Sequence, residues 1–525
     1  MSPSIPTLDD LAGDWLRPER EEDFSLPAIV NFRGQVQATW GASGVQQWVC
    51  APTGMATSTG LLFARQGERV RRVPADATEY RWRPYEIERR TALDGGSVHS
   101  RVRMPGGRAA VIERLSFHLD GERTFYLVFG GLARAWRFTD YWNLPPEDVP
   151  QMNAWFEGGA VWLDDTKTFG AARFLPCTPP ASVRVFASLE DLIAGLEDVD
   201  PGRDGRGKLV ALEYRVRDGD EISWIAEQGT DSSLLTSSAT DLEGLWESGK
   251  SHWEETWQAA FTPGNPRFSG NLPAFSCGDP TLERLYYMSQ LALLNSLREW
   301  PEPTHRDRYA TGGQAIWAVD ARPLRRAYVW GGTEGGTTTS FLWEVQLQAP
   351  LLALLDPEAF REQLEAFLLV DVHNHWGLES TTGRGAGMWY GVNDGAILGA
   401  AHDYLRTTGD LAWLDKEVSG RTVREHLIDA AEHWRRLDRD GMHLADYGAA
   451  QNILECVSTY EHRIAAFNAM NAWGMRQAAQ WLAPERAADL EREAAAVSQA
   501  VRALRHPDGY YRCLQPDGEE RAVRT

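Results

Sequence analysis

Glutamates set among aromatic and apolar residues are the side chains of this sequence that point most directly to chemistry. Glu344 follows Trp343 after a Gly/Thr-rich run, and Glu455 is flanked by apolar residues in ILECV. Glycosidic bond hydrolysis needs one carboxylic acid to protonate the leaving oxygen and one carboxylate to activate water, and an apolar setting raises the pKa of the acid. We therefore predict Glu455 as the acid, Glu461 as the second candidate for it, and Glu344 as a carboxylate that holds sugar hydroxyls or positions water.

Each of these glutamates also has a more ordinary explanation. Glu455 could be a helix-edge residue turned to water. Glu344 could be a first-turn carboxylate that interacts with the helix dipole, although the Gly/Thr run before it favours close approach of a ligand. Glu461 precedes a histidine and an arginine, so an ion pair at a helix start is its simpler role.

Aromatic and polar residues in the expected loops are candidates for sugar binding. The chain has 22 tryptophans; most will fill the core, but those between helices can present flat apolar faces to sugar rings. Asp394 could cap the helix that begins there, bind sugar, or do both, and Arg384 is ordinarily a surface residue. The predicted substrate-binding residues are Trp343, Trp376, Arg384, Trp389, Tyr390, Asn393, Asp394, Asp446 and Tyr447.

The spacing of possible ligands does not indicate a metal site. His373 and His375 form an HxH pair in a loop, but no third ligand stands at metal spacing. Asp438, Asp440 and Gly441 lack the remaining positions of a calcium loop, so a capped turn is the simpler interpretation. We predict no metal and no cofactor.

Composition limits the partners and the compartment. The formal net charge is −21, from 74 acidic against 53 basic residues, which argues against nucleic acid and anionic membranes as partners. No apolar run approaches the length of a membrane span, and the N-terminal stretch lacks the features of a signal peptide. The five cysteines are scattered without a CxxC pair, so we expect a reducing, cytoplasmic setting. The oligomeric state stays open.

Helices must position the candidate residues in the second half of the chain. From Pro280 onward apolar residues repeat at helical spacing, and Asp356 can cap a helix that starts at Pro357. The predicted helices cover 281–300, 341–355, 358–370, 394–408, 421–437, 460–482 and 485–504, without strand signals among them. Alternating short and long loops predict a toroid of helical hairpins, with the candidate residues on the long-loop side.

The first half of the chain predicts an antiparallel β-sandwich. The stretches 111–119 and 125–129 alternate apolar and polar residues, and Gly-containing turns recur. Runs on either side of Arg217–Asp220 predict a β-hairpin, and helices are expected at 188–196 and, as a linker, at 241–261. The predicted domains are the sandwich at 1–240, a linker at 241–275 and the helical catalytic domain at 276–525.

The second half also resembles a known family. FLWEVQLQAPLLALLDPEAFREQL is similar to the opening of the (α/α)6 catalytic domain in family 63 of the glycoside hydrolases, which are inverting α-glucosidases. RGAGMWYGVND resembles the loop before a barrel helix, DGMHLADYG resembles a DGxxEYG turn, and NILEC through NAMNAW lies where these enzymes have a general-acid loop and a long helix. The resemblance covers about residues 270–525 and implies a hydrolase of α-linked glucosides or oligosaccharides that acts with inversion.

Two departures from the family shape the expectations. Glu344 stands where the family usually has Asp, and the general-acid run Ser-Gly-[Met/Leu]-Asp is absent, so Glu455 or Glu461 would have to serve. The family's general base lies near the end of the complete barrel, beyond Thr525. We expect an incomplete (α/α)6 toroid that turns over substrate slowly. Its last helices are expected to expose apolar residues around Val497, Val501 and Leu504.

Several alternatives to a hydrolase stay open. They are a glycoside phosphorylase, another toroidal carbohydrate-active enzyme, a polysaccharide lyase, and a non-catalytic carbohydrate-binding or scaffold protein. A lyase would be expected to show a Tyr/His pair in place of two carboxylates. Phosphate dependence separates hydrolase from phosphorylase, and sugar binding without turnover would favour the binding protein. The partner common to the hydrolase and its carbohydrate-active alternatives is an oligosaccharide or glycoside.

Overall fold

The chain divides into two compact units. The computed structural model describes residues 5–18, 26–50, 53–55, 58–67, 69–73, 77–130, 153–164, 171–187, 191–192, 209–229, 232, 235–300, 324–329, 339–380, 383–449, 461–516 and 520–522. The β-rich unit comprises Met1–Phe261, Pro273–Glu299 and Gly331–Thr337, and the helical unit comprises Thr262–Leu272, Trp300–Trp330 and Thr338–Thr525. The predicted boundaries differ from this division, because the expected linker helix and the helix after it both fall in the β-rich unit.

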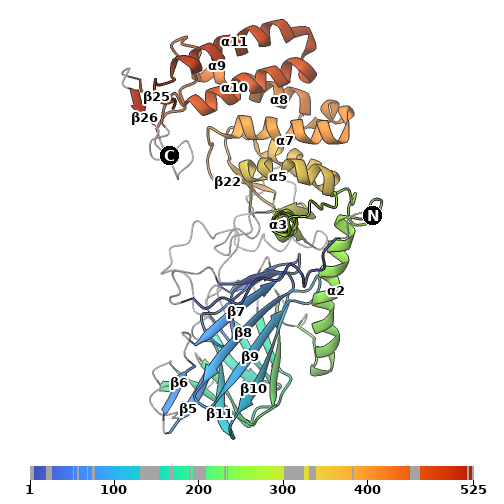
Figure 1. Ribbon diagram of the computed structural model, residues 1–525, viewed down its shortest axis with the longest axis vertical. Helices are drawn as coiled ribbons and strands as arrows, with labels where there is room; N and C mark the ends of the chain where they lie inside the picture. Colours follow the sequence, from blue (N-terminus) through green and yellow to red (C-terminus); the bar gives the residue numbers. More distant parts are fainter. Residues whose placement is uncertain are drawn as a thin grey trace. The chain divides into compact units, whose positions relative to one another are not determined.

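Antiparallel sheets make up most of the β-rich unit (Figure 1). The largest runs in the spatial order β12 (Asn153–Glu157), β13 (Ala160–Asp164), β14 (Ala171–Pro176), β17 (Glu221–Gly229), β10 (Ala110–Leu119), β9 (Gly96–Arg103), β8 (Glu86–Leu93) and β7 (Thr78–Arg83). A second sheet runs β15 (Ser182–Phe186), β16 (Leu209–Val216), β11 (Arg123–Phe129), β5 (Leu61–Gln66) and β6 (Arg69–Arg72). A third runs β1 (Ala28–Val30), β2 (Gln35–Ala38), β3 (Val45–Cys50) and β4 (Thr53–Met55).

Alternating side chains of the two larger sheets meet in one core. Val111, Leu115 and Phe117 of β10 pack in the same buried cluster as Phe125 and Leu127 of β11, although the two strands belong to different sheets. Successive side chains of a strand point to opposite faces, so every second residue reaches this core. The arrangement agrees with the predicted antiparallel sandwich.

The predicted β-hairpin around Arg217–Asp220 is wrong. The turn itself forms, with the Asp220 N–H donating to the Arg217 carbonyl at 3.1 Å and Gly219 at φ 80°. The flanking strands separate instead of pairing, because β16 pairs with β11 and β15 while β17 pairs with β10 and β14. Alternation and a turn define two strands but not their partners, and here the turn crosses from one sheet to the other.

One charged pair interrupts the apolar core of the sandwich. Glu113 follows the inward parity of β10 and is 0% exposed, as is Arg89 of β8. The Arg89 Nη2 lies 2.5 Å from the Glu113 Oε1. The same carboxylate accepts hydrogen bonds from the Ser100 Oγ at 2.6 Å and from the Gly44 backbone N–H at 3.1 Å. The buried charges are therefore paired and hydrogen-bonded, as burial requires.

Helix α2 (Leu242–Ala260) is the predicted linker helix, and it packs within the β-rich unit. Trp246, Trp253 and Trp257 are buried on its apolar side. The Trp253 Nε1 donates to the Val30 carbonyl at 2.7 Å, and the Arg103 guanidinium lies 4.3 Å from the centre of the Trp246 ring. Hydrogen bonds and a cation–π contact thus join the helix to the strands.

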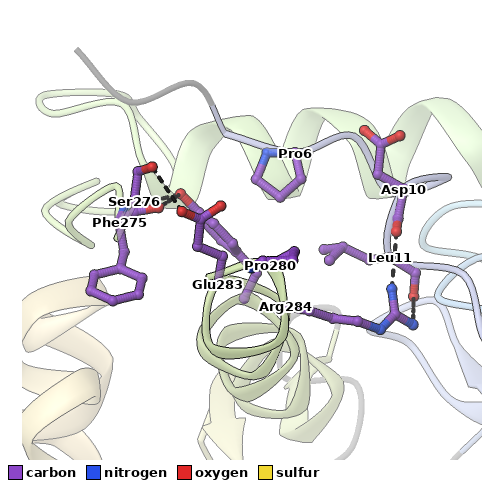
Figure 2. A pocket seen from close by; sticks show the side chains of 9 residues that line it. Pro6, Asp10, Leu11, Phe275, Ser276, Pro280, Glu283 and Arg284 are labelled. Atoms are coloured by element: carbon purple, nitrogen blue, oxygen red, sulfur yellow. Dashed lines mark hydrogen bonds between the residues drawn. The ribbon is translucent and has the colours of Figure 1, made fainter. Parts of the chain in front are cut away.

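Helix α3 (Pro280–Ser296) borders a cavity of about 500 Å³ (Figure 2). Asp279 caps this helix and Pro280 takes its first position; it ends before the predicted residue 300, at the short strand β18 (Leu297–Glu299). The charged groups around the cavity are already bonded: Arg284 donates to the carbonyl of Asp10 at 3.0 Å, and Glu283 accepts from the Ser276 hydroxyl at 2.8 Å. The cavity therefore marks where the N-terminal segment lies against α3.

The helical unit contains the helices predicted from residue 341 onward, with shifts at their ends, and the helix predicted at 421–437 forms as two. They are α5 (Leu342–Leu355), α6 (Pro357–Val370), α7 (Asn393–Thr408), α8 (Val423–Glu432), α9 (Trp434–Leu437), α10 (Ala465–Gln477) and α11 (Ala487–Ala503). In Figure 1 several of them lie side by side, and α7 contacts both α5 and α10. None of the helices in the described ranges is long and apolar enough to cross a membrane.

The turn between α5 and α6 confirms the predicted cap. The Asp356 side chain accepts a hydrogen bond from the Ala359 backbone N–H, and Pro357 occupies the first helical position. The Asp356 carboxylate also accepts hydrogen bonds from the Arg326 guanidinium at 3.0 Å and from the Tyr328 hydroxyl at 3.1 Å. Both residues belong to the short strand β19 (Arg326–Tyr328). Asp356 therefore caps α6 and also bonds to β19, a strand far from it in the sequence.

We predicted no strands among these helices, and this prediction is wrong. Short strands pair as β20 (Thr339–Phe341), β21 (Gly377–Glu379) and β22 (Arg384–Ala386), as β23 (Glu417–Val418) and β24 (Arg421–Thr422), and as β25 (Arg512–Leu514) and β26 (Glu520–Ala522). Each is two or three residues long, too short for an alternating apolar pattern. Of the helix predicted at 188–196, only 191–192 lie within the described residues, and both are helical.

The expected exposure of the last helix is also wrong. Val497 is 0% exposed, Val501 8% and Leu504 4%. Helix α11 contacts α10 along its length, and Leu490 and Ala494 complete its buried stripe. The apolar face that the sequence left without a partner is covered by the preceding helix of the same unit.

Candidate active site

The segments that precede α5, α7 and α10 meet at one edge of the helical unit. Phe341, just before α5, stacks on Trp376 at 4.4 Å between ring centres and an interplanar angle of 2°. Trp389, just before α7, lies 6.1 Å from Tyr447, which precedes α10. Since α7 also contacts α5 and α10, these stacking contacts bring the N-terminal ends of the three helices together.

Aromatic rings stack on one another at this edge, where Trp376 and Phe341 are half-buried and Tyr390 is buried. Trp376 lies 6.0 Å from Tyr390, with the planes tilted by 28°, in addition to its stacking on Phe341. Gly387 has φ 71°, and a Cβ there would approach the Trp376 Nε1 to 1.8 Å, so only glycine fits beside this ring. Stacked aromatic faces of this kind suit the apolar faces of sugar rings.

Two indole N–H groups of this edge are buried without a hydrogen-bond partner among the described residues. They belong to Trp343 and Trp389. Buried donors are normally paired, so an unpaired donor next to an aromatic surface is suited to a ligand oxygen. Both were predicted as sugar-binding residues.

Glu344 lies in the first turn of α5, beside this aromatic edge. The Leu342 backbone N–H donates to the Trp376 carbonyl at 3.1 Å, which ties the start of the helix to the segment 371–392. Among the described residues, none forms a hydrogen bond or ion pair with the Glu344 carboxylate, and its half-buried setting raises its pKa to about 7. A carboxyl of this kind can hold a proton near neutral pH, as an acid catalyst must.

The raised pKa of Glu344 has a consequence for stability. An unfolded glutamate titrates near about 4.3, so the native state holds this proton to higher pH than the unfolded state does, and stability falls as pH rises from about 4.3 to about 7. Glu344→Gln removes that loss. We expect the melting temperature of the variant to rise relative to the parent across this range and then level off.

Scanning calorimetry at pH 4, 6 and 8 measures this difference. Glu358→Gln is the matched control, since Glu358 is an exposed first-turn acid of the next helix. A Glu344→Gln difference that is the same at all three pH values would contradict the raised pKa.

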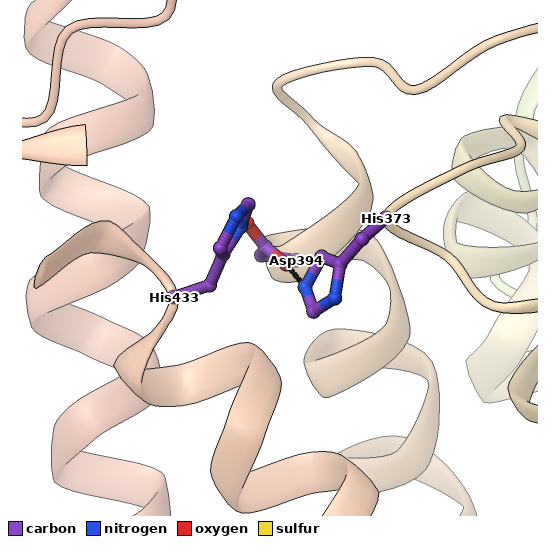
Figure 3. Close-up of side chains that lie close together, drawn as sticks. All are labelled: His373, Asp394 and His433. Atoms are coloured by element: carbon purple, nitrogen blue, oxygen red, sulfur yellow. Dashed lines mark hydrogen bonds and ion pairs between the residues drawn. The ribbon is translucent and has the colours of Figure 1, made fainter. Parts of the chain in front are cut away.

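Asp394 is buried between two histidines (Figure 3). Its Oδ1 lies 2.8 Å from the Nε2 of His373, and its Oδ2 lies 2.8 Å from the Nδ1 of His433. Burial would raise the pKa of Asp394, but the hydrogen bonds from the two imidazoles outweigh burial and lower it. Burial would lower the pKa of His373, and the Asp394 carboxylate outweighs that and raises it.

Two sequence-based interpretations change at this position. Asp394 does not cap α7: the cap residue is Val392, and no side chain makes a capping hydrogen bond there. His373 does have further metal-ligating neighbours, contrary to the expectation from the HxH spacing, whereas His375 turns away to the Gly387 carbonyl. His433, at the end of α8, was not singled out, because its proximity to His373 arises only from the fold.

Several predicted sugar-binding side chains are engaged within the protein. Asn393 is fully buried, and its Nδ2 donates to the carbonyls of Val372 at 2.7 Å and His375 at 2.9 Å. The buried Tyr447 hydroxyl accepts a hydrogen bond from the Asn471 Nδ2 at 2.7 Å. These two residues shape the edge and are less available to a ligand than Trp343 and Trp389.

The other predicted residues lie near the segments that lead into the helices. Asp446 accepts from the Gly448 backbone N–H and lies 2.9 Å from the His462 Nδ1. Arg384 is exposed in β22. Glu461 is half-buried and precedes α10. Glu455, the predicted acid, lies outside the described residues, so its role stays a prediction.

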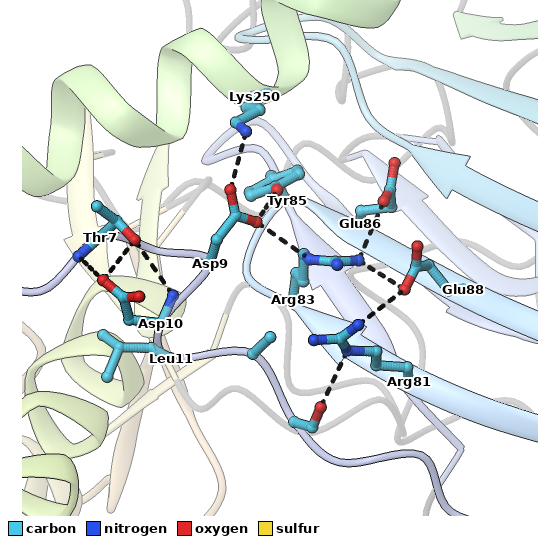
Figure 4. A network of polar contacts seen from close by, with 12 residues as sticks. Thr7, Asp9, Asp10, Leu11, Arg81, Arg83, Tyr85, Glu86, Glu88 and Lys250 are labelled. Carbon is cyan, nitrogen blue, oxygen red and sulfur yellow. Dashed lines mark hydrogen bonds and ion pairs between the residues drawn. The ribbon is translucent and has the colours of Figure 1, made fainter. Parts of the chain in front are cut away.

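A second cluster of charged side chains lies in the β-rich unit and is structural (Figure 4). Asp9 accepts from the Arg83 Nε at 3.1 Å and from the Lys250 Nζ at 3.0 Å, and Arg83 also binds Glu88 at 2.6 Å. The carboxylates of this cluster have cationic partners, which join the N-terminal segment to β7, β8 and α2. Their charges are therefore used in holding the fold.

Comparison with solved structures shows a shared fold. No protein-family model matches the chain, and no curated protein sequence does either. A bacterial glucoamylase complexed with acarbose is 10% identical at a TM-score of 0.59, with 94% of this chain and 70% of that chain covered. A family GH92 inverting mannosidase from Bacteroides thetaiotaomicron is 13% identical at a TM-score of 0.50, with 95% of this chain and 65% of that chain covered.

The chain therefore spans less than two thirds of the length of the mannosidase. The alignments extend across nearly all of this chain, so the β-rich and helical parts are both shared. At these identities the likeness is one of fold, and it does not single out family 63. The chain thus shares its fold with the glucoamylase and the mannosidase in both its β-rich and its helical part.

Proposed function

We propose that this protein is a glycoside hydrolase that cleaves α-linked glucosides or oligosaccharides with inversion, and that Glu344 is the carboxyl that donates the proton. The observation that carries the proposal is the position of Glu344: it lies half-buried in the first turn of α5, next to Trp343, and no described residue forms a hydrogen bond or ion pair with its carboxyl. Burial then raises the pKa of this carboxyl to about 7. Glu455, which was predicted from the sequence as the acid, becomes in this proposal a candidate for the carboxylate that activates water.

The chemistry of the surroundings supports this assignment. Protonation of a glycosidic oxygen needs a carboxyl that is still protonated near neutral pH, and Glu344 meets this requirement because burial disfavours its charged form. The half-buried rings of Phe341 and Trp376 offer apolar area. The N–H groups of Trp343 and Trp389, unpaired among the described residues, offer donors for sugar oxygens. A half-buried acid among aromatic platforms is what glycoside binding and cleavage require.

The second carboxylate must activate water on the opposite face of the sugar. In inverting enzymes the two carboxyl groups stand roughly 6.5–9.5 Å apart, which leaves room for that water. Glu455 and Glu461 were predicted from the sequence as candidates for the acid, and here they are proposed for the second carboxylate, because both lie in the segment that leads into α10. An (α/α)6 toroid, and membership of family 63, also belong to this proposal.

The test is an assay of residues 1–525 with a panel of α-glucosides and α-mannosides, with and without inorganic phosphate. We expect free sugar to be released without phosphate, and proton NMR to show the β-anomer first from an α-glucoside. Acarbose is a suitable first binding probe, since the similar glucoamylase was solved with it.

The same assay separates the alternatives. Release of a sugar 1-phosphate only when phosphate is present would replace the hydrolase by a phosphorylase. Tight sugar binding without any turnover would favour a carbohydrate-binding protein. Retention of the α-configuration in the first product would contradict single displacement.

A further inference from the structure

Three metal-ligating side chains from separate segments converge in the helical unit (Figure 3). His373 lies in the segment after α6, Asp394 in the first turn of α7, and His433 at the end of α8. Their ligand atoms all lie within 4.8 Å of one another, and each imidazole nitrogen lies 2.8 Å from a different oxygen of Asp394. The two rings are 4.0 Å apart between centres.

We propose that His373, Asp394 and His433 bind one divalent transition-metal ion, with Zn²⁺ as the expected occupant, through Nε2, a carboxylate oxygen and Nδ1. This goes beyond the proposed glycoside hydrolysis and does not depend on it. Two imidazoles and one carboxylate form a ligand set common in protein zinc sites, with a further position left for water or another ligand.

The three side chains are largely buried, which favours a bound ion over a chance cluster of polar groups on the surface. Asp394 is 2% exposed, and the side chains of His373 and His433 are 17% and 12% exposed. A buried carboxylate must be compensated, and here both of its oxygens face nitrogen ligands. Metal–ligand distances of about 2.0–2.2 Å place ligand atoms roughly 3–4 Å apart, so these side chains need only small shifts to bind an ion.

The groups behind His373 also match a metal site. Its second nitrogen, Nδ1, lies 3.6 Å from the Asp371 Oδ1 and 3.9 Å from the Asp429 Oδ2. A carboxylate behind a ligating imidazole orients the ring and strengthens it as a ligand. Asp429 is itself held by Arg436 at 2.5 Å. His373 thus has carboxylates near both of its ring nitrogens, and a bound ion would need only a small ring shift to bring the second nitrogen within hydrogen-bond distance.

The donor set favours zinc over calcium and magnesium. Ca²⁺ takes six to eight oxygen ligands and Mg²⁺ keeps several waters in near-octahedral geometry, whereas imidazole suits Zn²⁺ and similar transition ions. An ion here would join the segment before α7 to the end of α8. It would also fix the ring of His433, which lies 5.6 Å from Trp389.

The experiment uses the full chain after chelator treatment and titrates it with Zn²⁺, Co²⁺ and Ca²⁺. We expect one equivalent of Zn²⁺ by calorimetry, an intense visible absorption with Co²⁺ typical of low coordination number, and a rise in melting temperature that grows with ion concentration. Ca²⁺ should produce none of these effects.

Variants then locate the site. His433→Ala and Asp394→Asn should each weaken Zn²⁺ binding at least 10–100-fold, the range that loss of even an outer partner causes, while His375→Gln should bind as the parent does. His375 is the matched control because it belongs to the same HxH pair and contacts the Gly387 carbonyl instead. If Asp394→Asn fails to fold, His433→Ala decides, with circular dichroism as the check on folding.

Two outcomes would overturn the proposal. One is a parent protein that binds no ion or only Ca²⁺, which would leave Asp394 as a carboxylate held by two hydrogen bonds. The other is Zn²⁺ binding that is unchanged in His433→Ala, which would place the ion elsewhere. Neither outcome bears on glycoside turnover, so the two proposals fail independently.

Discussion

Glu344→Gln is expected to lower the rate of glycoside hydrolysis by about 10²–10⁴-fold, the contribution that a general acid typically makes. Glutamine keeps the shape of the side chain but cannot transfer a proton to the leaving oxygen. Because the aromatic surfaces of Trp376 and Trp389 are untouched, the dissociation constant for acarbose should change little. Initial rates on an oligosaccharide substrate, with calorimetric titration of acarbose, measure the two quantities.

A substrate with a good leaving group separates the possible roles of Glu344. α-Glucosyl fluoride needs little protonation of its leaving group, so Glu344→Gln should reduce its hydrolysis far less than that of an oligosaccharide. Equal reductions on both substrates would show that Glu344 positions water or sugar hydroxyls and does not donate the proton. Glu358→Gln, in the first turn of the next helix, should leave both rates unchanged.

Glu113→Ala is expected to lower the free energy of unfolding of the β-rich unit by about 3–5 kcal/mol, the usual cost of removing one partner of a buried ion pair. The substitution leaves the Arg89 guanidinium charged and 0% exposed inside the sandwich. It also leaves the Ser100 hydroxyl and the Gly44 N–H without their acceptor. Urea unfolding followed by tryptophan fluorescence measures the change.

Two further variants give this prediction its controls. Glu122→Gln removes an exposed ion pair with Arg217, 2.7 Å long, and should cost less than about 1 kcal/mol. Arg89→Met combined with Glu113→Leu removes both charges and should recover much of the loss. A cost for Glu113→Ala as small as that for Glu122→Gln would mean that the buried charge is compensated in another way.

Local signals explain why the helices could be predicted so closely. Asp356 and Pro357 mark a helix start through contacts within four residues, and the apolar stripe of α7 depends only on helical spacing. Strand pairing is different, because it depends on residues far away in the chain. The run before Arg217 and the run after it were each identified as strands, yet neither could reveal that they enter different sheets.

The residues of the candidate site also fall into two groups, those that the sequence identifies and those that only the fold brings together. Trp376 and Trp389 could be chosen because they are aromatic residues in predicted loops, and Glu344 because it is an acid at a predicted helix start, next to Trp343. The partners of Asp394 could not, since His433 approaches it only after α7 and α8 pack together. A helix cap was the simplest local explanation of Asp394, and a contact across the fold replaced it.

The place of β17 in the largest sheet has a consequence for how the chain folds. β17 lies between β14 and β10, and its pairing with β10 joins Ala110 to Glu227. It is also the last strand of that sheet in chain order, so during synthesis the earlier strands emerge before their central neighbour exists. Pairings between such distant residues form slowly. The strand edges of β10 and β14 therefore stay open until residue 229 has left the ribosome, and this is the interval in which a nascent chain is most exposed to aggregation.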